Sequence, residues 1–300
     1  MSQFILRVPA AIMVMLLVVM QACQTKTTSR LLSLNLEKGK MYEYEVVTDQ
    51  QQEMMEQKSE IRATAAYQMQ VLDVKAGVQT VKVTYKKFKM HMKIMEFVLD
   101  IDTDNPGKPL SSDEIQSNPL GMMGNIFEGI KDKSFTLQLD KEGSILSVTG
   151  FDKILKDMIS PLQVDENSRL QISASLQDQF NEENIKDQFR PFFNIFPNNE
   201  VKPGDSWEKS WKTGGRMPSS FVTTYTVKDI DGDHVNLITN TKIMSDRKEM
   251  EIKGTQKGPL LIDSKSGLVI SGSFDQETDA VYQNMEIRIK SKAGIKGKEL

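Results

Sequence analysis

Few residues in this 300-residue chain carry the side chains that catalysis usually requires. It has one cysteine, Cys23, and two histidines, His91 and His234. A serine-nucleophile triad needs a histidine as its general base. His91 lies in an alternating stretch and His234 follows a turn, so each is better interpreted as a strand or surface histidine than as a catalytic base. The sequence also lacks Gly-x-Ser-x-Gly, His-Glu-x-x-His and glycine-rich phosphate-binding motifs. These absences argue against several common enzyme classes.

Two segments resemble metal-binding patterns without completing them. Met90-His91-Met92 offers ligands that suit Cu(I), but in a strand the two methionines share one face and His91 takes the other. Residues 100–105 alternate acidic side chains as calcium loops do. The loop lacks a glycine at its sixth position, and Ser111 stands where the twelfth-position glutamate is needed. We therefore predict no metal and no cofactor.

The chemistry that the spacing does favour is lipidation of Cys23. A short polar and basic start precedes an apolar run, Val8 to Met20, which ends at Ala22-Cys23. This is the layout of a secretory signal peptide, and its end resembles the lipobox at which bacterial lipoproteins are acylated. A transmembrane helix is the first alternative, but thirteen residues fall short of the about 20 that a span requires. An ordinary cleaved signal with an incidental cysteine is the second.

The mature chain has the size of one large domain or two modest ones. Removing residues 1–22 also removes Arg7, so the formal net charge changes from −3 to about −4. Such a balance provides no basic field for nucleic acid. With Cys23 acylated, no thiol remains for a disulfide or a metal site. Residues 23–30 are small and polar, as expected of a lipidated tether.

Alternating apolar residues around glycine turns predict antiparallel hairpins. Lys75-Ala76-Gly77 and Asp231-Gly232-Asp233 each separate two alternating runs. Turns at Gly143 and Gly267 do the same, and Gly39 and Gly204 each precede aromatic strands. Because the order of these features repeats, we predict a mainly β (α+β) fold with curved sheets in two related halves, residues 31–150 and 200–300.

Between the halves, apolar residues recur at steps of three to five, which favours amphipathic helices over strands. The helical segments are Phe151 to Ile159 and Glu166 to Phe196, within a connection of residues 151–199, and a weaker one is Asp113 to Ile130. We expect these helices to join and partly cover the sheets. Two apolar clusters on them are candidate walls for an apolar ligand: Met122, Met123, Ile126, Phe127, Phe189, Phe192, Phe193 and Phe196. The alternative is that both clusters simply fill the core.

These features together resemble a family of uncharacterised bacterial envelope lipoproteins catalogued as domain of unknown function 6263. The resemblance rests on the start at Lys38 to Tyr44, on Phe196-Pro197 ahead of Val201 to Trp207, and on Gly254-Thr255-Gln256 ahead of Asp263 to Val269. It covers essentially the whole mature chain. The family has no assigned activity, so the resemblance implies a class of protein, the envelope lipoproteins, and a cellular location, but no mechanism.

The sequence thus favours a non-catalytic binding or interaction protein of the cell envelope, held by acylated Cys23 at the outer membrane and facing the periplasm. Its partner is an envelope protein or an apolar ligand, and not nucleic acid. The first alternative is a carrier of a lipid-like ligand between sheet and helices. The second is a hydrolase that uses paired carboxylates, for which the sequence offers several acidic residues: Glu53, Glu56, Asp100, Asp102 and Asp104.

Overall fold

The computed structural model describes residues 29–55, 57–108, 119–162, 164–214, 218–245, 250–282 and 285–300. The predicted signal peptide, Cys23 and Glu56 lie outside these residues. None of the helices within the described ranges is long and apolar enough to cross a membrane.

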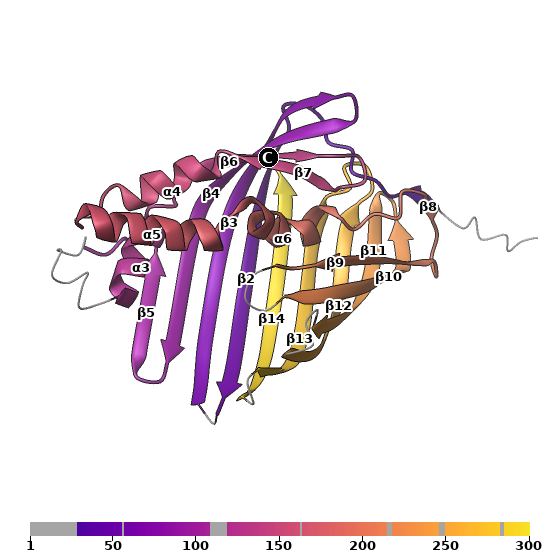
Figure 1. Ribbon diagram of the computed structural model, residues 1–300. Helices are drawn as coiled ribbons and strands as arrows, with labels where there is room; N and C mark the ends of the chain where they lie inside the picture. The colour runs from indigo at the N-terminus through magenta and orange to yellow at the C-terminus, as the bar shows by residue number, and fades with distance from the viewer. Residues whose placement is uncertain are drawn as a thin grey trace, which may run out of the picture.

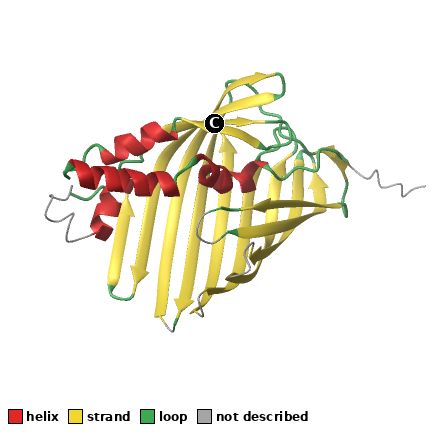
Figure 2. Cartoon of the chain, in the orientation of Figure 1, coloured by secondary structure: helices red, strands yellow, loops and turns green. Residues whose placement is uncertain are grey.

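The protein is mainly β and antiparallel, as the alternating pattern predicts (Figure 2). The strands that precede the main helical segment are β1 (Arg30–Leu31), β2 (Met41–Met54), β3 (Gln57–Lys75), β4 (Val78–Ile94), β5 (Phe97–Asp102), β6 (Ser134–Leu139) and β7 (Ile145–Thr149). Those that follow it are β8 (Glu200–Val201), β9 (Ser206–Lys212), β10 (Ser219–Asp231), β11 (His234–Ser245), β12 (Met250–Asp263), β13 (Val269–Tyr282) and β14 (Met285–Glu299). Many are longer than the five or so residues usual for strands.

One large sheet contains nearly all of these strands, in the order β7-β6-β4-β3-β2-β14-β13-β12-β11-β10-β9, with β5 paired to β4. A second, two-stranded sheet pairs β1 with β8. Strands β14 and β2 join the two predicted halves through a continuous antiparallel ladder. The halves are therefore connected by sheet hydrogen bonds as well as by the helical segment. Their origin by duplication stays a prediction.

The predicted turns lie between the expected strands. Residues Ala76 and Gly77 connect β3 to β4, and Gly232 lies between β10 and β11. Gly77 and Gly232 have φ of +79° and +57°. This left-handed region suits tight hairpin turns and favours glycine, so the sequence places both hairpins correctly.

Four described helices interrupt the β pattern: α3 (Pro119–Glu128), α4 (Phe151–Ile159), α5 (Glu166–Gln179) and α6 (Glu182–Phe193). The predicted helical segments are confirmed in α4, α5 and α6. Side chains of Asp165 and Asn181 cap α5 and α6 by accepting hydrogen bonds from backbone N–H groups, as good N-cap residues do. Helix α3 begins at Pro119, which suits this position because the first helical residue needs no N–H donor. Residues 113–118 of the predicted segment Asp113 to Ile130 lie outside the described residues.

The helices lie across one face of the sheet, towards one end of its strands (Figures 1 and 2). Rings on α6 contact tyrosine rings on the sheet: Phe189 lies 5.6 Å from Tyr67, and Phe192 lies 6.2 Å from Tyr44, between centroids. One buried apolar cluster extends along the chain from Leu32 to Ile295 and includes side chains of both halves and of the helices. A chain that begins at residue 24 retains this whole cluster, so we treat residues 24–300 as an independently folding unit.

Candidate functional site

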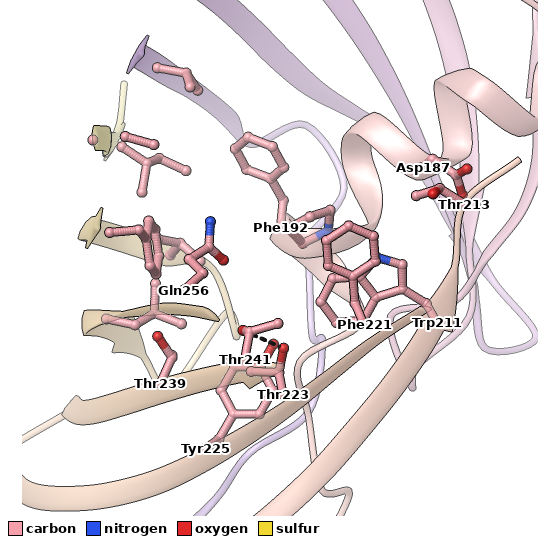
Figure 3. A pocket seen from close by; sticks show the side chains of 18 residues that line it. Asp187, Phe192, Trp211, Thr213, Phe221, Thr223, Tyr225, Thr239, Thr241 and Gln256 are labelled. Atoms are coloured by element: carbon pink, nitrogen blue, oxygen red, sulfur yellow. Dashed lines mark hydrogen bonds between the residues drawn. The ribbon is translucent and has the colours of Figure 1, made fainter. Parts of the chain in front are cut away.

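A half-open cavity of about 280 Å³ lies between α6 and the sheet (Figure 3). Trp211 on β9 and Val46 on β2 both line it, although six strand-to-strand steps separate β9 from β2 in the sheet order. Steps of about 4.8 Å would place these strands about 29 Å apart in a flat sheet. The sheet therefore curves strongly, and its curvature together with α6 creates the cavity.

The walls of the cavity are mostly apolar. They come from α6 and from six strands of the sheet: Val46, Pro191, Phe192, Trp211, Phe221, Tyr225, Leu260, Val269, Phe274, Ala293 and Ile295. Trp211 and Phe221 are directly opposed on β9 and β10, and their rings stack with centroids 5.2 Å apart and planes within 2°. Such walls are typical of pockets for small apolar ligands, and the volumes of such pockets start at about 300 Å³. A smaller volume can suffice, since an engineered apolar cavity of about 150 Å³ binds benzene.

Four polar side chains interrupt these walls on neighbouring strands: Thr223 on β10, Thr239 and Thr241 on β11, and Gln256 on β12. We call them the polar band. The three threonines are almost fully buried, at 2%, 4% and 2% exposure in that order. The hydroxyl oxygens of Thr223 and Thr241 lie 2.7 Å apart and share a hydrogen bond (Figure 3). Buried polar groups require hydrogen-bond partners, so the polar band differs in its requirements from the apolar walls around it.

The electrostatic character of the cavity is neutral to weakly acidic. Asp187 on α6 is the acidic residue of the lining, and its carboxylate accepts hydrogen bonds from the Arg190 guanidinium and from Gly214 N–H, the latter at 3.3 Å. Burial raises the pKa of the Tyr225 phenol well above its ordinary value, so Tyr225 is uncharged at neutral pH. Among the described residues that line the cavity, none is a lysine, arginine or histidine.

The structure brings one of the eight predicted ligand-lining residues, Phe192, to this cavity. The other aromatic residues of its cluster, Phe189, Phe193 and Phe196, are buried in the core. The helix α3 cluster also packs in the core: Ile126 is buried, Met122 and Phe127 are half-buried against the same cluster, and Met123 is half-buried. The walls are thus formed mainly by the sheet and not by the helices.

The other described residues considered for chemistry also lie apart from the cavity lining. Glu53 lies on β2 and His234 on β11, whereas the rest lie on β4, on β5 or just after β5. Met90 and Met92 alternate with His91 along β4, and His91 Nδ1 lies 2.7 Å from an oxygen of Asp100. Lys89 donates to Asp102 at 2.6 Å, and this bond, followed by one from Asn105, holds the pKa of the Asp102 carboxyl well below its usual range. No group of three or more potential metal-ligating His, Cys, Asp or Glu residues occurs within the described ranges.

Sequence reasoning missed most of the cavity. The spacing of Trp207 and Trp211 matches that of Tyr225 and Phe221 on the next strand, and both pairs stack across β9 and β10. That matched spacing was the available signal for an aromatic wall. The polar band gave no signal, because threonine is common in strands for its β-branched shape alone.

Comparisons with solved structures give distant likenesses. The chain matches "Lipid-protein interactions in lipovitellin" at 8% identity and a TM-score of 0.47, over 88% of this chain and 25% of that one. It matches the β domain of the Bordetella autotransporter BrkA at 6% identity and a TM-score of 0.36, over 85% and 98% of the two chains. At such TM-scores neither likeness assigns a ligand or a role. No curated protein matches the sequence.

The comparison with protein families is more informative. A family model described as "Family of unknown function (DUF6263)" matches residues 76–269. The match extends from the β3–β4 turn to the first residue of β13, and therefore includes all four described helices and the strands β9 to β12 that form much of the cavity wall. The chain belongs to this family, domain of unknown function 6263.

Proposed function

We propose that this protein is a non-catalytic binding protein that holds a small, largely apolar molecule in the cavity between α6 and the curved sheet. The observation that carries the proposal is the cavity itself, which is half-open, about 280 Å³ in volume and lined mostly by apolar side chains. Soluble proteins place such side chains in close-packed cores. A space of this size among aromatic rings is therefore best explained by a ligand.

A binding role is also favoured by the positions of the acidic residues. Carboxylate-dependent hydrolysis of glycosides requires two carboxyl groups about 5–10 Å apart. Asp187 is the carboxylate of the described cavity lining, and Arg190 binds it. Asp102 and Asp104 are instead paired with Lys89 and Lys131 beside β4 and β5. The cavity is thus suited to holding a molecule rather than to cleaving one.

A binding experiment tests this proposal directly. Residues 24–300, purified without detergent, are titrated with the fluorescent apolar probe N-phenyl-1-naphthylamine. We expect saturable binding of one probe per protein, because the cavity is a single defined space. Native mass spectrometry before and after solvent extraction provides an independent measurement of any ligand carried through purification. Linear, non-saturating fluorescence together with a ligand-free mass would contradict the proposal.

The cellular location belongs to the same proposal. Cys23 would be acylated after removal of residues 1–22 and would hold the protein in the cell envelope, at the outer membrane and facing the periplasm. Two or more acyl chains suffice for stable anchoring. A cavity for apolar molecules is useful beside a membrane, where such molecules enter and leave the bilayer.

Acylation of Cys23 can be tested by metabolic labelling. In a bacterial host fed radiolabelled palmitate, the full chain should incorporate label and sediment with membranes. Cys23→Ser should lose both properties, because serine has no thiol to carry the diacylglyceryl group. Gln24→Ser is the matched control and should remain labelled. Membrane association that survives Cys23→Ser would rule out this anchor.

A further inference from the structure

The polar band indicates which class of apolar molecule the cavity accepts. Thr223, Thr239 and Thr241 are nearly as inaccessible as the core, yet they line the cavity together with Gln256. In Figure 3 the labelled Thr223, Thr239 and Thr241 lie close together, at one side of the labelled Trp211, Phe221 and Phe192 rings. A ligand that fills the cavity therefore meets aromatic surface in one part and hydrogen-bonding groups in another.

The band retains hydrogen-bonding capacity after its internal bonds are counted. Thr239 donates its hydroxyl proton to Gly258 O at 3.0 Å, which leaves its oxygen as an acceptor. The Thr223–Thr241 pair uses one of its two hydroxyl protons in its shared bond, and Thr223 also hydrogen-bonds the Tyr225 hydroxyl; oxygen lone pairs remain beyond these bonds. Gln256 donates one N–H to Gln276 Oε1 at 3.3 Å and keeps a second N–H and its carbonyl oxygen. The band is therefore richer in acceptors than in donors.

The surrounding charges disfavour an anionic ligand. The described lining provides no cationic side chain, and its acidic residue, Asp187, already binds Arg190. Arg190 also donates to Lys212 O at 3.3 Å, so its guanidinium is held by both partners. A carboxylate on the polar band would be buried beside few free donors and without a compensating charge, and buried charges need a partner. A neutral group that donates a hydrogen bond needs no compensating charge and finds acceptor oxygens on the polar band.

We propose that the ligand is an uncharged amphiphile, whose apolar body lies against Phe192, Trp211 and Phe221 and whose hydroxyl or amide group donates to the polar band. This inference rests on the proposed binding function and adds the chemical class of the ligand. It assigns the Thr223–Thr241 pair as a specificity determinant, since its acceptor oxygens distinguish a hydroxyl from a methyl group.

A set of three ten-carbon probes tests the inference: 1-decanol, decanoate and decane. Each competes with N-phenyl-1-naphthylamine for residues 24–300 at pH 8. The informative quantity is the ratio of the decane dissociation constant to the decanol dissociation constant, compared between the native protein and the double variant Thr223→Val/Thr241→Val. The substitution preserves side-chain shape and removes both partners of the Thr223–Thr241 bond together, so neither threonine keeps a hydroxyl that has lost the other. Tyr225 also loses its bond to Thr223, equally for all three compounds, and this loss cancels in the ratio.

We expect the decane-to-decanol ratio to fall about threefold to tenfold in the double variant, the effect of losing one hydrogen bond to the ligand. Decanoate should bind more weakly than decanol to the native protein. Thr224→Val/Thr226→Val makes the same chemical change at alternate positions of β10, outside the cavity lining, and should leave the ratio unchanged. Retained probe binding shows that each variant is folded.

The possible results separate the two proposals. If neither the fluorescent probe nor any ten-carbon compound binds saturably, the proposed binding function fails and this inference fails with it. If the compounds bind but the ratio is the same in the native protein and the double variant, only the assignment of the polar band fails. Tighter binding of decanoate than of decanol would likewise overturn the uncharged class while supporting the binding function.

Discussion

Replacing Gly143 by alanine should cost the protein about 3 kcal/mol or more of its free energy of unfolding, which is at the severe end for single substitutions. Two effects combine at this turn between β6 and β7. Gly143 has φ of +80°, where a side chain is strained. An added Cβ would also lie 1.8 Å from the carbonyl oxygen of Phe193, the last residue of α6. Backbone must therefore move, and the packing of α6 moves with it.

Gly204→Ala provides the matched control for this prediction. Gly204 also has a left-handed conformation, with φ of +92°, but nothing lies within 4 Å of the position of an added Cβ. Its substitution should cost only the conformational strain, about 1–2 kcal/mol. Urea unfolding of residues 24–300, followed by tryptophan fluorescence, measures both. Equal losses in the two variants would show that the contact between the turn and α6 does not constrain the fold.

Ala293→Phe should weaken binding of N-phenyl-1-naphthylamine by about tenfold or more, because each 1.4 kcal/mol of lost burial is a factor of ten. Ala293 lies on β14, is half-buried and lines the cavity beside Ile295. A phenyl ring added there would occupy space that a ligand otherwise fills. The fluorescence titration measures the loss, and urea unfolding should show that the variant is still folded.

Lys292→Phe is the control that adds a ring at the preceding residue. Because successive side chains of a strand point to opposite faces, Lys292 is exposed on the other side of the sheet. Probe binding to Lys292→Phe should match that of the native protein. If Ala293→Phe also binds the probe as the native protein does, the ligand lies elsewhere and the cavity between α6 and the sheet is not the site.

The local elements of this fold were predictable because their signals are local. The step pattern of apolar residues predicted Phe151 to Ile159 as a helix, and α4 has these bounds. Glycines at hairpin turns indicated where strands begin and end, because the need for a left-handed turn residue depends only on the few residues around the turn. The antiparallel, mainly β class follows from these turn glycines together with the alternating apolar residues on either side of them.

The polar band and the aromatic wall were not predictable in the same way. Thr223, Thr239 and Thr241 look like ordinary strand residues, and they line one cavity only because β10 and β11 pair in a particular register. In that register Thr223 lies opposite Thr241, and Tyr225 lies opposite Thr239. Neighbouring strands thus concentrate polar groups that are 16 to 18 residues apart in the chain.

Gly143 and Gly204 show where local pattern ends and three-dimensional packing begins. Both were identified as turn glycines from their neighbours, and both have positive φ. Only the folded chain places Phe193 of α6 against Gly143 while leaving Gly204 open. Likewise, residue types alone marked Phe189, Phe192, Phe193 and Phe196 as apolar, but only the packing of the folded chain placed Phe192 at the cavity and the others in the core. Secondary structure depends on near neighbours in sequence, whereas a cavity depends on sheet curvature and helix placement, which arise from contacts between distant residues.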